Sequence, residues 1–147
     1  MKLAIALLAA LVLLGCGSAV DTHTAAITVA AGFHSTAGGA VDAARGAALD
    51  AVEAEHPTVG DERTAALRAE ASRWEPIGAA LDASRTVLVG WLGVVSQVEA
   101  GADVWELVPP LVGRLVTLWG DVVRLAAGLG LELPALPSVV TSLAGAL

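Results

Sequence analysis

The apolar residues of this chain recur at steps of three and four along almost its whole length, and this spacing constrains the fold more than any other feature. Such steps place side chains on one face of an α-helix, whereas a half-buried strand needs every second residue to be apolar. No such alternation of useful length interrupts the helical pattern. We therefore predict an all-α fold for residues 21–147.

Prolines and glycines divide this pattern into three long helices and one short helix. Short turns at residues 57–60 and 101–103 make consecutive helices antiparallel neighbours. A proline-punctuated linker, residues 133–137, leads to a last uncharged helix that Ser138 can cap. We expect one domain, an antiparallel three-helix bundle with a short C-terminal helix packed on it. The predicted helices cover residues 21–56, 61–100, 103–129 and 138–147.

Local signals predict where these helices begin and where they are disturbed. Asp21 or Thr22 can cap the first helix. The pair Gly38 and Gly39 predicts a break or a kink in it, because glycine destabilises a helix interior by up to about 1 kcal/mol relative to alanine. Pro76 removes one backbone hydrogen bond and predicts a kink or a division of the second helix.

The predicted core combines one helix of small side chains with a few large ones. The stripe on the first helix is mostly alanine, so a neighbouring helix can approach it closely, and such a seam closes more readily than it opens. Residues 86–95 are apolar on every side, which predicts burial. Phe33 is the only phenylalanine, and the four tryptophans are predicted to fill the core. Trp105, beside Glu106, is the expected exception.

The N-terminus carries a second pattern. Lys2 precedes the apolar run 3–14, which is too short to span about 30 Å of hydrocarbon as a helix, and Gly15 and Cys16 follow. The string Leu13-Leu14-Gly15-Cys16 resembles the lipobox of bacterial lipoproteins. This resemblance implies cleavage between Gly15 and Cys16, with diacylglycerol and acyl chains on Cys16 as the only covalent group. The alternative is an ordinary secretory signal that is cut elsewhere.

The resemblance also predicts the organisation and the location of the chain. Residues 1–15 form the signal, residues 16–20 a lipidated tether, and residues 21–147 the folded domain. Lipoproteins with aspartate directly after the cysteine commonly stay in the inner membrane, and here Gly17 holds that position. We therefore expect an exported protein on the periplasmic face of the outer membrane where the host is Gram-negative.

Composition excludes several classes of partner and of site. The formal net charge is −7, and because Lys2 is the single lysine, seven arginines oppose fifteen acidic residues after cleavage. This acidity argues against binding of nucleic acid. One cysteine cannot form an intrachain disulfide. No sequence motif for a metal, a phosphate or a catalytic nucleophile is present, so we predict a non-enzymatic protein without a metal or another cofactor.

Two sets of polar residues are candidate sites. His23, His34 and His56 fall on an eleven-residue grid that also includes Arg45. Successive members are about 16 Å apart on a helix, so one metal ion cannot join them, and a solvated helix face is the preferred interpretation. Arg114, Asp121 and Arg124 form a narrow polar stripe on the third helix, where Asp121 and Arg124 are close enough to pair. With Trp105, this stripe is the predicted interaction surface, and an ordinary wet helix face is the alternative.

These observations predict a small lipid-anchored helical protein of the bacterial cell envelope. The preferred hypothesis is that it acts by contact with an envelope protein or with a second copy of itself, since few charges leave spare apolar surface. One alternative is a phage or prophage lipoprotein that acts in lysis, like the outer-membrane subunit of a spanin, or in superinfection exclusion. Another is a small carrier of a lipid or other ligand.

Overall fold

The computed structural model describes residues 18–145, and all regular structure within that range is helical. The all-α prediction is therefore confirmed. The predicted signal segment, with Gly15 and Cys16, lies outside the described residues. The helices are α2 (Ala19–Glu55), α3 (Asp61–Glu99), a short 3-10 helix η1 (Trp105–Leu107), α4 (Val108–Gly128) and α5 (Ser138–Gly145).

Helix α2 begins earlier than its sequence predicted, because Ser18 is its cap. The Asp21 amide donates to Ser18 Oγ at 3.2 Å, and the Ser18 amide donates to Asp21 Oδ2 at 2.9 Å. This is a capping box with an aspartate in the third helical position. The expectation that Asp21 or Thr22 is the cap is wrong: Asp21 lies inside the first turn and closes the box.

Both long helices also continue through their predicted weak points. Helix α2 is unbroken at Gly38 and Gly39, and α3 is not divided at Pro76. An interior proline costs about 3 kcal/mol, but Trp74 and Ile77, on either side of it, are buried at 6% and 1% exposure. Burial of these two large side chains offsets that cost. Tertiary packing, rather than local propensity, decides the continuity of α3.

Helices α3 and α4 end where their glycines predict. At the end of α3, the Ala102 amide donates to the Gln97 carbonyl, and Gly101 has φ 93°. At the end of α4, the Leu131 amide donates to the Ala126 carbonyl, and Gly130 has φ 78°. Both are Schellman motifs, which need a left-handed residue and therefore favour glycine.

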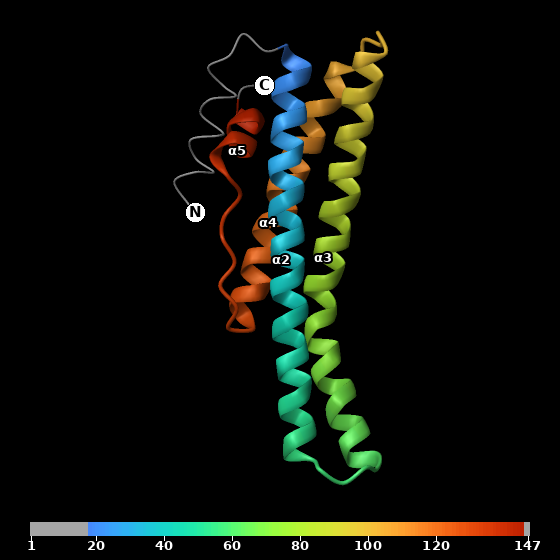
Figure 1. Ribbon diagram of the computed structural model, residues 1–147, viewed down its shortest axis with the longest axis vertical. Coiled ribbons are helices and arrows are strands. Elements are labelled where there is room, and N and C mark those ends of the chain that lie inside the picture. Colours follow the sequence, from blue (N-terminus) through green and yellow to red (C-terminus); the bar gives the residue numbers. More distant parts are fainter. Residues whose placement is uncertain (1–17, 146–147) are drawn as a thin grey trace.

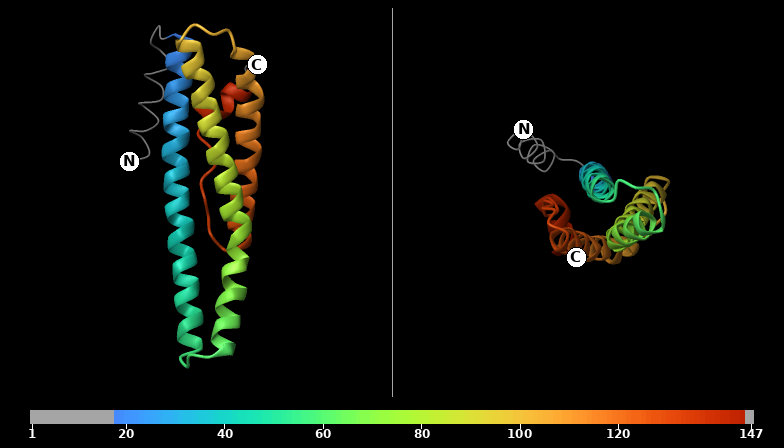
Figure 2. Two further views of the ribbon diagram at one scale, coloured as in Figure 1. Left: turned by 90° about the vertical axis from the view of Figure 1, so that its right-hand side faces the viewer. Right: turned by 90° about the horizontal axis from the view of Figure 1, so that it is seen from below.

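Helices α2 and α3 form a long hairpin, and α4 covers only its upper part (Figure 1). Helix α3 packs against both α2 and α4, and α5 packs against α4 and α2. Seen along the long axis, the four helices follow one another around an arc (Figure 2). Between α4 and α5, the linker of residues 129–137 runs back along α4. The lower ends of α2 and α3 extend beyond α4 as a two-helix arm.

The core consists of two clusters. The upper cluster centres on the fully buried Trp91 and is closed by Val139 and Val140 of α5. The lower cluster joins Val41, Trp74, Ile77, Leu81, Val122 and Ala126. Trp91 and Trp74 are buried in these clusters, and Trp119 is buried at 3% exposure outside them. Trp105 is half-buried, as expected.

The predicted burial of residues 86–95 is wrong in part. Val87, Leu88, Trp91, Val94 and Val95 are buried, but Val89 is 63% exposed and Leu92 is 47% exposed. Helix α3 meets α2 and α4 on one side only, so a helix that is apolar all round keeps an apolar outer face. That face is the first feature of functional interest.

Candidate functional site

The predicted anchor lies two residues before Ser18, where the described part of the chain begins. Lipidation of Cys16 stays a prediction, since Gly15 and Cys16 lie outside the described range. Ser18, the cap of α2, follows Cys16 by two residues. Helix α2 has 37 residues and is about 55 Å long at 1.5 Å per residue. A lipid on Cys16 would therefore hold one end of a rigid rod, with almost no slack between lipid and helix.

The structure does not gather the predicted interaction residues into one site. Arg124 Nη2 pairs with Asp121 Oδ1 on α4, and 76% of the Arg124 side chain is exposed. Arg114 is exposed on the same helix, two turns earlier. Trp105 lies before α4 begins and packs against His23 of α2, with ring centroids 5.0 Å apart. The polar stripe thus lies on the surface of α4, whereas Trp105 packs against α2.

His23 lies in an aromatic pocket and not on a solvated face. It is 8% exposed and meets Trp91 edge-on, with ring centroids 5.7 Å apart. Its Nδ1 and the Trp91 Nε1 are buried without a hydrogen-bond partner among the described residues. Burial lowers the pKa of His23, because an apolar setting disfavours the charged ring. This corrects the solvated-face prediction for His23.

The other two histidines border the seam between α2 and α3. His34 Nε2 donates to the Leu81 carbonyl at 2.8 Å. His56 Nδ1 lies 4.0 Å from Glu62 Oε1. Both are partly exposed, so they are neither fully solvated, as predicted, nor part of the core.

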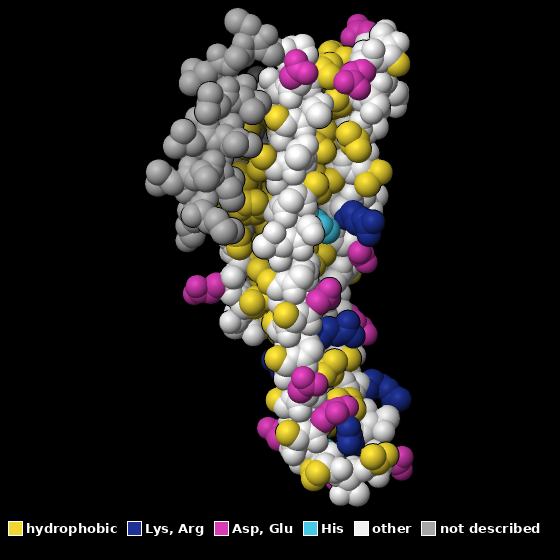
Figure 3. Space-filling model, in the orientation of Figure 1, with side chains coloured by type: hydrophobic (Ala, Val, Ile, Leu, Met, Phe, Trp, Pro, Cys, Tyr) yellow, Lys and Arg dark blue, Asp and Glu magenta, His cyan; other side chains and the backbone are white. Residues whose placement is uncertain are grey.

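The two-helix arm carries most of the ion pairs. Arg63 pairs with Glu53 across the hairpin at 2.9 Å. Trp74 Nε1 donates to Glu70 Oε1 at 3.0 Å, and this bond, with a second from Arg73, lowers the pKa of Glu70. Charged side chains lie at this end, at the opposite end and along the middle of the face that Figure 3 shows. The ion pairs among them stabilise the hairpin. A recess of about 290 Å³ between α2 and α3 is bordered by Asp42, Arg45, Asp82 and Arg85.

An outer recess lies between α2 and α3 on the upper part of the molecule. It has a volume of about 530 Å³, and Val89 and Leu92 border it on α3. On α2, Gly38 and Gly39 form its floor, where a Cβ would meet no atom within 4 Å. No charged residue occurs at positions 22–41 or 86–98. The recess is therefore open and mainly apolar, and Asp42 and Arg85 bound one end of it.

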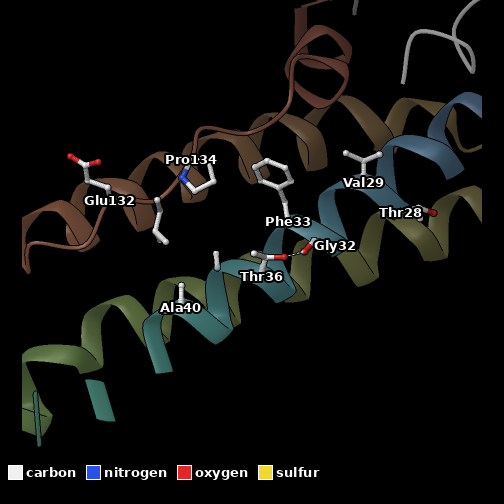
Figure 4. Close-up of a pocket in the computed structure, with 10 residues that line it drawn as sticks. Thr28, Val29, Gly32, Phe33, Thr36, Ala40, Glu132 and Pro134 are labelled. Carbon is white, nitrogen blue, oxygen red and sulfur yellow. Dashed lines mark hydrogen bonds between the residues drawn. The ribbon is translucent and has the colours of Figure 1, made fainter. Parts of the chain in front are cut away.

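A groove lies on the other side of α2, between this helix and the linker. It has a volume of about 560 Å³. Phe33 points into the space between the two walls, and Pro134 faces it from the linker (Figure 4). Hydrophobic side chains are visible along this border in Figure 3. The lining residues are Thr28, Val29, Gly32, Phe33, Thr36, Ala37, Ala40, Glu132, Leu133 and Pro134.

The groove is present because the extended linker, and not a helix, lies beside this part of α2. At the upper end α5 contacts α2, but lower down the linker takes its place, and an extended strand of chain fills less space than a helix 10–12 Å across. Trp119 Nε1 donates to the Pro134 carbonyl at 3.0 Å and holds the linker against α4. The expectation that small side chains close the seam is therefore wrong on this side of α2.

The described residues contain no group of three or more His, Cys, Asp or Glu side chains that could hold a metal ion. Within the same range, α3 is the one helix that is long and apolar enough to cross a membrane by length and composition, a property that core helices of soluble bundles share. Comparison with protein-family models, with curated proteins and with solved structures finds no match to this chain.

Proposed function

We propose that the chain is a non-enzymatic lipoprotein of a bacterial cell envelope, tethered through Cys16, that acts by contact with another protein or with a second copy of itself. In this proposal residues 1–15 are a cleaved signal helix. The mature chain is an antiparallel three-helix bundle with a short C-terminal helix. It lies on the periplasmic face of the outer membrane in a Gram-negative host. It needs no cofactor beyond the acyl chains on Cys16.

The exposed apolar face of α3 is the observation that carries this proposal. Val89 and Leu92 are the most exposed large hydrophobic side chains of the upper half. They border a recess whose floor is glycine, so another helix can approach the backbone of α2 closely. Burying an exposed valine or leucine contributes roughly 1.5–3 kcal/mol. A partner surface would gain this free energy from each of them.

The position of the face along α2 suits contacts above a membrane. Gly38 is twenty residues beyond Ser18, which is about 30 Å along the helix. A tether at Cys16 would hold the recess outside the headgroup layer when the rod stands upright. Neighbouring proteins of the envelope could then reach it.

Photo-crosslinking in living cells tests the contact. A photoreactive amino acid at position 89 should give discrete higher-mass adducts, whereas the same amino acid in place of Ala69, exposed on the arm of α3, should give few. Adducts of twice the chain mass indicate self-association, and other masses indicate a partner. Equal, unspecific labelling from both positions would contradict the proposal.

Substitution of the anchor tests the tether. We expect Cys16→Ser to leave the exported chain in the soluble fraction after a carbonate wash, because two or three acyl chains stabilise membrane attachment by about 0.8 kcal/mol per buried methylene. Retention of the Cys16→Ser variant in the washed membranes would refute the lipid anchor. The outcome does not depend on the crosslinking result.

A further inference from the structure

We propose that the groove between α2 and the linker binds the acyl chain of a single-chain membrane lipid whose headgroup is uncharged or zwitterionic, such as a lysophospholipid. This binding site is separate from the outer recess and from the lipid on Cys16. Its dimensions, its lining and its charge each support this occupant.

The groove is long enough to hold one hydrocarbon chain. Its lining residues on α2 run from Thr28 to Ala40, a length of about 18 Å. Its volume is about 560 Å³.

The length of an acyl chain agrees with the length of the groove. One leaflet of a bilayer is about 15 Å of hydrocarbon, so an acyl chain of ordinary length fits within the groove. Pockets of 300–1,000 Å³ are typical of small-molecule sites. The groove therefore has the capacity for a whole chain, and not only for its end.

The lining has almost no free hydrogen-bonding groups. Thr28 Oγ1 donates to the Thr24 carbonyl at 2.9 Å, and Thr36 Oγ1 donates to the Gly32 carbonyl at 2.9 Å. Both hydroxyls are thus engaged with their own helix. An apolar chain would displace water from this wall without leaving a polar group unpaired.

Both walls of the groove are also held in place before a ligand binds. Phe33 contacts Trp119, with ring centroids 6.4 Å apart, and the same Trp119 bonds the Pro134 carbonyl. One buried tryptophan thereby supports both sides of the groove. A ligand would not have to order the linker on binding, which lowers the free-energy cost of association.

Charge selects the headgroup. Glu132 is the one charged residue among those that line the groove, and it lies with Ala40 at the end remote from Thr28 and Val29 (Figure 4). The full chain carries a net charge of −7. An anionic headgroup would be repelled there, whereas the ammonium of a phosphoethanolamine group would be attracted.

A separate lipid fits better than the chain's own anchor. Thr28 is ten residues beyond Ser18, about 15 Å along α2. An acyl chain on Cys16 would use about its whole length to reach the near end of the groove. It would leave most of the groove, and the Glu132 end, unfilled.

The test uses the full-length protein in membranes and two matched glycine variants of α2. Gly32 lines the groove, and Gly46 is exposed elsewhere on the helix. A Cβ at either position would meet no atom within 4 Å, so Gly32→Leu and Gly46→Leu should both fold. The probe is lysophosphatidylethanolamine with a sixteen-carbon, diazirine-bearing chain, and mass spectrometry locates the label after illumination.

We expect label on residues 28–40 and 132–134 in the wild type and in Gly46→Leu. It should fall at least about tenfold in Gly32→Leu, since the new side chain fills the space of about four methylenes, each worth roughly fourfold in affinity. Label on these residues that is equal in all three proteins, or absent from the wild type, overturns the proposal.

Two further labelling experiments identify the source of the bound acyl chain and the headgroup that the groove prefers. If the chain's own lipid filled the groove, Cys16→Ser would label where the wild type does not, and this result would overturn the assignment to a separate lipid. A lysophosphatidylglycerol probe should label the wild type less than the zwitterionic probe does, and Glu132→Lys should remove that difference. Preference of the wild type for the anionic probe would refute the role of Glu132.

Discussion

Substitution of Val95 by aspartate tests the inward face of α3 directly, and Val89 supplies its control. Both are valines on one helix, and they differ in burial: Val95 is 1% exposed and Val89 is 63% exposed. Aspartate and valine have similar helix propensities, so propensity cancels between the two variants. A difference in stability would therefore report burial alone.

The expected magnitude follows from burial. Val95→Asp removes about 1.5–3 kcal/mol of stabilisation that comes from burial of the valine side chain. Burial also raises the pKa of a carboxyl by as much as about 3–5, and each pKa unit is worth about 1.4 kcal/mol. Because the buried carboxyl takes up a proton once its folded-state pKa exceeds 7, this second contribution is limited to about 4 kcal/mol at pH 7. The total, about 6–7 kcal/mol, is comparable to the whole stability of a domain, about 5–15 kcal/mol. Val89→Asp should change the stability by about 0.5 kcal/mol or less.

Circular dichroism of residues 18–147 during urea unfolding at pH 7 measures both variants. We expect Val95→Asp to be unfolded or to melt at much lower urea, and Val89→Asp to match the wild type. Equal midpoints, or greater damage from Val89→Asp, would refute the register of α3 and with it the exposed face. Val95→Asp should recover stability as the pH falls towards 4, because burial of a neutral carboxyl costs less free energy than burial of a carboxylate.

Three further outcomes are expected. Because burial lowers the pKa of His23 in the folded state, the unfolded chain binds its proton first, so stability should decline as the pH falls below 6.5. Thermal melts at pH 7.5 and 5.5 should show a smaller loss for His23→Phe than for the wild type. Ser18→Ala should lower the unfolding free energy by about 1 kcal/mol, as urea titration would show, whereas Ser35→Ala, in the exposed middle of α2, should not. Trp119→Phe keeps the ring but loses the bond to the Pro134 carbonyl, worth about 0.5–1.5 kcal/mol. Hydrogen exchange in the linker should accelerate in that variant, and unchanged exchange would show that the bond does not hold the linker.

Helix boundaries were predictable from the sequence because local chemistry sets them. Gly101 and Gly130 adopt the left-handed conformations that helix ends require, and Pro57 and Pro137 lie where helices cannot continue or have not begun. The start of α2 was misplaced by a few residues because Ser18 and Asp21 can both cap, and only their reciprocal bonds decide between them.

Helix faces were not predictable to the same degree. On α2 the apolar stripe consists mostly of small residues, so the sequence favoured a solvated face for His23, whereas the structure buries it. On α3, residues 86–95 are uniformly apolar, and only the number of neighbouring helices decides that Val89 and Leu92 stay exposed. The groove depends on where the linker lies against α4, which no spacing of residues encodes.

The two cavities lie on different sides of α2, whose side chains are mostly small. The outer recess, about 530 Å³, borders the exposed face of α3. The groove, about 560 Å³, is present where the extended linker lies beside α2. The two proposed activities consequently depend on different glycines of the same helix. A leucine at Gly39 would fill the outer recess and affect contacts with a partner, whereas a leucine at Gly32 would fill the groove and affect the lipid. Each activity can thus be removed while the other is retained, which a single shared surface would not allow.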